Sequence, residues 1–206
     1  MSNILTAKVT IRGTRPLMWH WFGPDAIPLE KVEKAGVAGN DPTEWRRSCL
    51  VTKDGQLFLN SNYVFGTVQA GGKFVPRKRS NIMAAITATL QVAEDRILID
   101  RYMPGFPNGH DCNLKTVETP DRDASAPTYL DVRSVVNPQT KGRNVRYRVA
   151  AAPGWQTTFT LQWDKTVVSR GEMEAALIES GHLVGIGSGR KIGMGRFEIV
   201  SFVVNE

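Results

Sequence analysis

The 206-residue sequence predicts an α+β fold whose strands and helices follow the order β-α-β-β-α-β. Residues 5–11 alternate apolar and polar side chains, with the period of two that is typical of a half-buried strand. The first half of the chain also contains residues typical of helix starts and apolar residues at helical spacing. The last third is predicted to contain a strand, a helix, a glycine-rich loop and a second strand, in this order. We expect an antiparallel sheet with helices on one face, which leaves the other face free to bind.

After the first strand, three helices and a brief strand are predicted. The stretch Asp-Pro-Thr-Glu at 41–44 supplies an N-cap, a proline in the first helical position and an acid in the third, so a short helix is expected over 41–50. A turn at 53–56 leads to a strand at 57–59, and Asn60 can cap a helix that crosses 63–70 and ends at Gly71-Gly72. Apolar residues at helical spacing predict a further helix at about 81–93.

The middle of the chain is predicted to be irregular. Residues 100–132 contain four prolines and show no sustained period. We therefore expect a single domain over residues 1–206, with an irregular insertion or hairpin at about 100–147.

The last third gives the clearest pattern. Apolar and polar residues alternate over 158–164, which predicts a strand. Ser169 and Glu172 form a capping box, and Gly181 is placed to end the helix that follows. One face of that helix is expected to hold Met173, Ala176, Leu177 and Ser180.

Composition excludes several classes of protein. No run of about 18 apolar residues is present, and the N-terminus lacks the pattern of a signal peptide, so a cytoplasmic protein with no membrane contact is expected. Two cysteines without CxxC spacing and three scattered histidines predict no metal site, and no cofactor is expected. The spacing assembles no paired carboxylates, activated nucleophile or metal triad for a conventional small-molecule enzyme.

Positive charge is concentrated in three stretches, at 73–79, 133–148 and 185–197. Together they hold twelve basic residues and no acid, which leaves 14 basic against 20 acidic residues in the rest of the chain. Such segregation favours an anionic partner, and we expect the three stretches to form one continuous surface. The alternative is three solvated loops that never meet.

The glycine-rich stretch at 185–199 matches neither standard phosphate loop. It lacks the GK[ST] of a Walker A loop, and Ile192 stands where a dinucleotide fingerprint needs its third glycine. Both motifs nevertheless rely on glycines that let backbone N–H groups approach phosphate, beside basic side chains. The alternative is a glycine-rich hairpin without a ligand. The residues predicted to bind nucleic acid are Lys73, Arg77, Lys78, Arg79, Lys141, Arg143, Arg146, Tyr147, Arg148, Gly187, Gly189, Arg190, Lys191, Gly193 and Arg196.

Aromatic side chains lie within or beside the basic stretches and could stack on unpaired bases, the alternative being a place in the core. They are Tyr63, Phe65, Phe74 and Tyr147.

The stretches Gly-Ile-Gly at 185–187 and Gly-Met-Gly-Arg-Phe at 193–197 resemble the glycine-rich loop of the RAMP superfamily of CRISPR-associated proteins. In that family the loop directly precedes the last strand of a ferredoxin-like (RRM-like) domain. The resemblance covers about half of the chain and is densest over 181–199. Residues 59–66 occupy the place of the family's first conserved helix, but Phe65 stands before Gly66 where the family carries lysine, and the nearest cation is Lys73. This departure suits a divergent or phage-borne relative.

The resemblance implies a protein that binds single-stranded RNA, including a guide RNA, along the sheet face and the loop. Its further partners would be other copies of itself or related subunits of a ribonucleoprotein for antiviral defence. Some RAMP proteins cut RNA with a histidine or an aspartate after the first strand, and His20 and Asp25 offer both types there. An endoribonuclease is therefore one alternative. The non-catalytic interpretation is that His20 is packed among its aromatic neighbours and that Asp25 is a turn residue. A basic module that binds an acidic protein is the second alternative.

Overall fold

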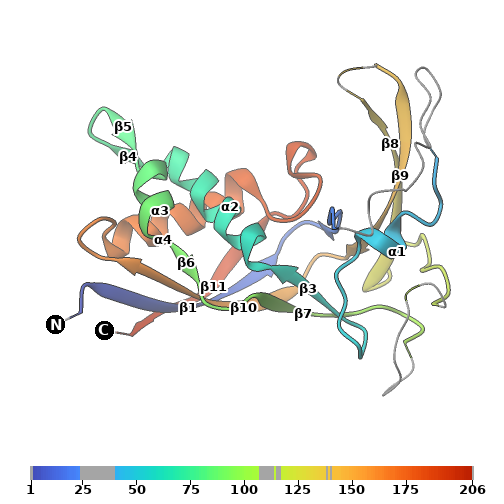
Figure 1. Cartoon of the computed structure of the whole chain (residues 1–206), viewed down its shortest axis with the longest axis horizontal. Helices are drawn as coiled ribbons and strands as arrows, with labels where there is room; N and C mark the ends of the chain where they lie inside the picture. Colours follow the sequence, from blue (N-terminus) through green and yellow to red (C-terminus); the bar gives the residue numbers. More distant parts are fainter. Residues whose placement is uncertain are drawn as a thin grey trace. The chain divides into compact units, whose positions relative to one another are not determined.

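The computed structural model describes residues 2–23, 40–106, 114, 117–137, 139 and 141–205. The chain divides into two compact units (Figure 1). Unit 1 comprises residues 1–17, 58–100 and 153–206, and unit 2 comprises residues 18–57 and 101–152. Most of the segment predicted as an insertion thus belongs to unit 2, together with residues 18–57.

Unit 1 is built around a six-stranded sheet. Its strands follow the order β11-β1-β10-β7-β3, and β6 also pairs with β10. Strand β1 (Ile4–Gly13) lies antiparallel between β10 (Gln156–Asp164) and β11 (Phe197–Asn205). The remaining strands are β3 (Gln56–Asn60), β6 (Gln91–Val92) and β7 (Arg96–Tyr102). Burial in β1 alternates as predicted, because Leu5, Ala7, Val9 and Ile11 all point into the core.

Three helices cover one face of this sheet in Figure 1. They are α2 (Ser61–Gly71), α3 (Met83–Thr89) and α4 (Arg170–Glu179). The predicted α+β class is confirmed, since α2 and α4 each connect strands of the sheet. The capping box at Ser169 and Glu172 forms as predicted, and α3 is shorter than the predicted helix because the chain turns into β6 after Leu90.

The prediction that Gly181 ends the last helix is wrong. After α4 the chain continues as a π-helical turn, η3 (Ser180–Val184), and Gly181 lies inside it. A Cβ atom at Gly181 would stand 2.2 Å from the carbonyl oxygen of Phe197, so glycine is needed for close packing against the start of β11. The turn ends instead at Gly185, whose φ is 80°.

Short elements complete unit 1. The 3-10 turn η2 (Gly72–Phe74) leads into a small hairpin of β4 (Pro76–Arg77) and β5 (Ser80–Asn81). A second 3-10 turn, η4 (Arg190–Ile192), lies within the glycine-rich stretch.

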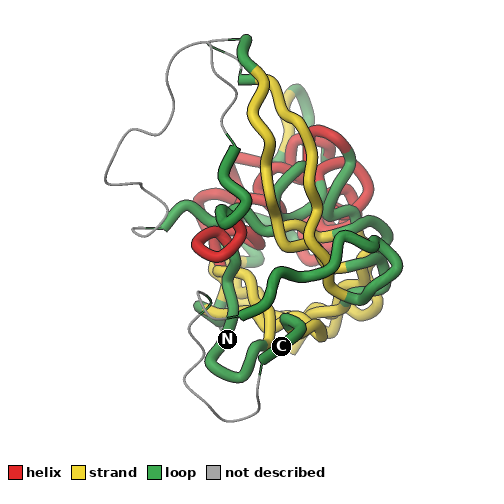
Figure 2. Tube along the Cα trace, turned by 90° about the vertical axis from the view of Figure 1, so that its right-hand side faces the viewer, coloured by secondary structure: helices red, strands yellow, loops and turns green. Residues whose placement is uncertain are grey.

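Unit 2 is built on a long hairpin of β8 (Thr128–Val136) and β9 (Arg143–Ala151), which Figure 2 shows as two strands running side by side. Strand β2 (Leu17–Met18) adds to β9, and the N–H of Trp19 donates to Val149 O at 3.0 Å. Helix α1 spans only Trp45–Ser48. The helix predicted over 41–50 is thus much shorter, because Asp41 accepts the N–H of Thr43 at 2.9 Å and holds the chain in a turn before Trp45.

Candidate nucleic-acid interface

The glycine-rich loop, residues 185–196, is closed at its base by backbone hydrogen bonds. Ile186 N donates to Gly195 O at 2.9 Å, and Gly195 N donates to Pro16 O at 2.8 Å. A Cβ atom at Gly195 would lie 1.8 Å from Ile186 O, and φ there is 68°. Glycine at 195 is therefore required by both space and backbone conformation.

Two buried hydroxyl groups hold the base of the loop against α2. Thr67 Oγ1 donates to Gly185 O at 3.2 Å, and Ser180 Oγ lies 3.0 Å from Thr67 O. Both side chains are buried. No pattern in the sequence pointed to Thr67, whereas Ser180 was predicted to share a helical face with Met173, Ala176 and Leu177. A hydroxyl group among such apolar neighbours indicates a hydrogen-bonding role.

The tip of the loop presents backbone donors. Gly187, Gly189 and Gly193 have φ values of 81°, 77° and 80°, and the left-handed Gly189 is followed by the right-handed turn η4. Within the described part of the chain, the N–H groups of residues 187–191 have no hydrogen-bond partner. Alternation of left-handed and right-handed residues makes successive N–H groups converge into a concave anion site.

Two cations flank these donors, because Arg190 and Lys191 are both exposed. The third predicted cation, Arg196, lies at the base of the loop and is partly buried. Its carbonyl oxygen accepts from Thr14 N at 2.8 Å and Arg15 N at 3.2 Å, which joins the loop to the end of β1. The charge of the loop is thus concentrated at its tip.

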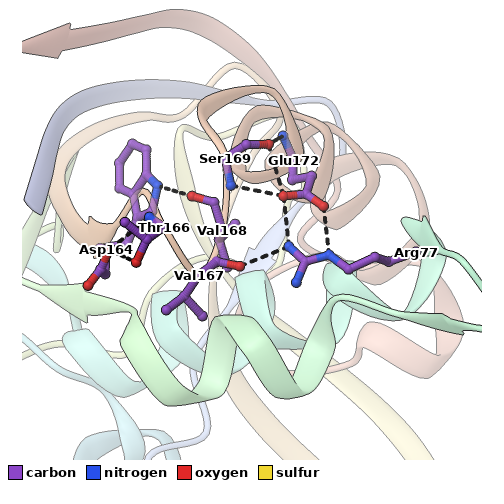
Figure 3. A network of polar contacts seen from close by, with 8 residues as sticks. Arg77, Asp164, Thr166, Val167, Val168, Ser169 and Glu172 are labelled. Atoms are coloured by element: carbon purple, nitrogen blue, oxygen red, sulfur yellow. Dashed lines mark hydrogen bonds and ion pairs between the residues drawn. The ribbon is translucent and has the colours of Figure 1, made fainter. Parts of the chain in front are cut away.

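Arg77, by contrast, has a structural role (Figure 3). Its guanidinium donates from Nε to Glu172 Oε1 and from one terminal nitrogen to Glu172 Oε2, both at 2.7 Å, and from the same nitrogen to Val167 O at 3.0 Å. These bonds from Arg77 are the main reason that the pKa of Glu172 falls to about 2, and they outweigh the opposing effect of burial. These bonds give Arg77 a structural role, because they hold the β4–β5 hairpin to the start of α4.

The other cations of this stretch, Lys73, Lys78 and Arg79, are exposed. In Figure 1 the β4–β5 hairpin projects from one end of the helix layer and the 185–196 loop from the other. The prediction of one continuous basic surface is therefore wrong for these two stretches. They lie at opposite ends of unit 1.

The third basic stretch lies on the β8–β9 hairpin of unit 2, and its members differ in their surroundings. Arg133 donates from Nε to Asp131 at 2.5 Å, and Arg146 donates to Glu44 at 2.9 Å. Lys141 and Arg143 are exposed near the hairpin turn. Tyr147 is 7% exposed, so its ring belongs to the core and offers no face for base stacking. Phe74 is exposed, while Tyr63 and Phe65 are partly buried.

Of the two candidate catalytic residues, Asp25 lies outside the described residues. His20 has a side chain that is 27% exposed, and its Nε2 lies 3.4 Å from Glu44 Oε1. Burial raises the pKa of Glu44, but hydrogen bonds from His20 and Tyr147 N and the charge of Arg146 outweigh it, and the net pKa is lowered. Glu44 is thus a carboxylate that ties His20, α1 and β9 together.

Neither metal nor membrane features are seen in the described part of the chain. It contains no group of three or more His, Cys, Asp or Glu that could hold a metal ion, and no helix long and apolar enough to cross a membrane.

No protein-family model and no curated protein matches the sequence. Among solved structures, the chain is similar to a chain in the cryo-EM structure of the Type III-B Cmr-beta bound to cognate target RNA. The TM-score is 0.47 and the sequence identity is 10%. The match covers 98% of this chain and 61% of that chain, so this chain spans less than two thirds of its length.

Proposed function

We propose that this protein binds the phosphate backbone of single-stranded RNA through the 185–196 loop, as a RAMP-type subunit of a CRISPR-type or related ribonucleoprotein. The observation that carries the proposal is the loop tip, where the N–H groups of residues 187–191 have no partner in the described chain and lie beside exposed Arg190 and Lys191. Backbone donors and cations at one place are what a phosphate group needs.

The proposed recognition does not depend on base sequence. The loop contains no aromatic side chain, so it has nothing to stack on a base. Contacts to phosphate fix the position of a nucleic acid without distinguishing its bases. A guide strand of varied sequence is a ligand of this kind.

Further contacts are proposed at separate places on each unit. Lys73, Lys78 and Arg79 would contact phosphates at the other end of the helix layer in unit 1, and Lys141 and Arg143 would contact them from the hairpin of unit 2. Separate contact points suit a long flexible strand, because such a ligand can follow more than one surface. Other copies of this chain or related subunits would share that strand.

The test replaces Arg190 and Lys191 together by alanine and measures RNA affinity over a range of salt concentrations. Each lost contact to single-stranded nucleic acid lowers the slope of log K against log salt by about 0.7, so a decrease of up to about 1.4 is expected. Lys165→Ala is the matched control, since Lys165 is exposed on a turn outside the proposed sites. An unchanged slope in the double variant would show that the loop is structural.

An endoribonuclease is the second candidate, and the contact between His20 and Glu44 favours it. A carboxylate that orients a histidine is a common element of general base catalysis. His20→Gln is expected to leave RNA affinity nearly unchanged, and any RNA cleavage by the wild type would have to disappear in this variant. If the protein binds an acidic protein instead, its affinity for single-stranded RNA will be weak and unaffected by the loop substitutions.

A further inference from the structure

Arg148 is the partly buried arginine of the β8–β9 hairpin whose side chain makes no hydrogen bond or ion pair with a described residue. Arg133 is paired with Asp131, and Arg146 with Glu44. Arg148 is partly buried, and its Nε atom is inaccessible to solvent and makes no hydrogen bond. No hydrogen bond or ion pair of the Arg148 side chain is found with any described residue of the chain.

The strand register places the charged groups on one face of the hairpin. Asp131 lies directly opposite Arg148, and Arg133 lies opposite Arg146. Residues directly opposite in an antiparallel pair point to the same side, so all four side chains share that face. Glu44, which directly precedes α1, belongs to the same cluster because its carboxylate accepts a hydrogen bond from the guanidinium of Arg146.

Charge at this cluster is unbalanced. Three guanidinium groups, those of Arg133, Arg146 and Arg148, face the two carboxylates of Asp131 and Glu44, so these five groups carry a single net positive charge. Burial lowers the pKa of Arg148, and the charges of Arg146 and Arg133 lower it further, against the opposing effect of Glu44 and Asp131. A partly desolvated cation without a hydrogen-bond partner is destabilising, and an anion that accepts its hydrogen bonds reduces this cost.

We propose that Arg148 is the central residue of a phosphodiester-binding site on this face of the β8–β9 hairpin, flanked by the charges of Arg133 and Arg146. A single excess positive charge matches the single negative charge of a phosphodiester better than the near-double charge of a terminal phosphate. The planar guanidinium presents paired N–H groups that suit two phosphate oxygens. That the phosphodiester comes from RNA rests on the proposed function. The site itself is independent of the 185–196 loop.

The first experiment measures thermal unfolding of the full chain with dimethyl phosphate, a monoanionic phosphodiester, at constant ionic strength. For the wild type we expect a rise in Tm of about 3–5 °C when dimethyl phosphate reaches ten times its dissociation constant. Arg148→Met should show no rise, and without the ligand it should be at least as stable as the wild type, because methionine needs no partner. Arg170→Met changes an exposed arginine of unit 1 that lies outside every proposed binding site, and it should keep the full rise.

Three outcomes would overturn the site: no rise in the wild type, an equal rise in Arg148→Met, or an equal rise when acetate replaces dimethyl phosphate. The last would show a carboxylate site.

A second experiment measures binding of single-stranded RNA to Arg148→Met and to the Arg190 and Lys191 double variant. Loss of one charge-assisted contact predicts an affinity about tenfold lower for Arg148→Met. Unchanged RNA affinity in this variant, in a protein that binds RNA, would overturn the assignment to RNA. If the wild type binds no RNA at all, the proposed function is wrong. The phosphodiester site is then tested by the first experiment alone, in which the rise in Tm must depend on Arg148.

Discussion

Replacing Arg77 by glutamine should destabilise unit 1 without weakening RNA binding. The variant removes the guanidinium that donates to both carboxylate oxygens of Glu172 and to Val167 O. Glu172 has a pKa of about 2 in the folded chain, against an ordinary value of 4.5. This lowering of the pKa corresponds to a contribution of at most about 3 kcal/mol to the free energy of unfolding. The side chains of Arg77 and Glu172 are 35% and 28% exposed, so solvent screening reduces the expected loss to about 1 kcal/mol.

The effect has a defined dependence on pH. A carboxylate whose pKa is lowered by folding stabilises the protein above its ordinary pKa, and the stabilisation is lost as pH falls through the folded-state value. The contribution of Arg77 should therefore be complete at pH 7 and should decline between about pH 5 and pH 2.

Urea unfolding at pH 7 and pH 3 measures this contribution in the wild type, Arg77→Gln, Glu172→Gln and the double variant. We expect a coupling free energy of about 1 kcal/mol at pH 7 and a smaller one at pH 3. Lys78→Gln is the matched control on the same hairpin, because Lys78 is exposed. It should leave stability unchanged and lower RNA affinity. If Arg77→Gln is as stable as the wild type at pH 7 and binds RNA less tightly, then the structural role assigned to Arg77 is wrong.

Gly195→Ala should unfold the base of the loop and abolish RNA binding, because its Cβ would meet Ile186 O. A Cβ atom at Gly193 would have no neighbour within 4 Å, so Gly193→Ala should lower the free energy of unfolding by only about 1 kcal/mol, because alanine is strained at the positive φ of this position. Urea unfolding of the two variants measures the difference. Ser180→Ala removes a buried hydroxyl that lies within hydrogen-bond distance of Thr67 O and Ala176 O. It should lower the free energy of unfolding by about 1 kcal/mol, and a fully stable variant would count against a role in anchoring the loop. Burial raises the pKa of the Cys49 thiol, so in a Cys112→Ser variant a thiol reagent should react only after denaturant is added.

Local patterns in the sequence were sufficient for the main elements of unit 1. The alternation over residues 5–11 predicts β1 because neighbouring side chains of a strand point to opposite faces, and one of those faces is apolar. The capping box predicts the start of α4 because its two bonding residues lie within one helical turn. The glycine-rich stretch likewise predicts a loop whose backbone takes positive φ values.

Local patterns failed where an element's extent depended on distant neighbours. Gly181 resembles a helix stop, but its lack of a side chain serves the packing of η3 against Phe197. The hairpin of β8 and β9 shows no clear alternation because parts of both strand faces are buried, so its sequence predicts only an insertion or hairpin.

What the sequence by itself determined is where the positive charge lies along the chain and which stretches form strands and helices. Only the tertiary structure decided which of those charges remain free to meet a ligand. Arg77 is paired with a residue 95 positions away and Arg146 with one 102 positions away, while Arg190 and Lys191 stay exposed on a loop closed at its base. The physical reason is that secondary structure follows from neighbours along the chain, whereas the partner of a long flexible cation is whichever carboxylate the fold brings within hydrogen-bond distance.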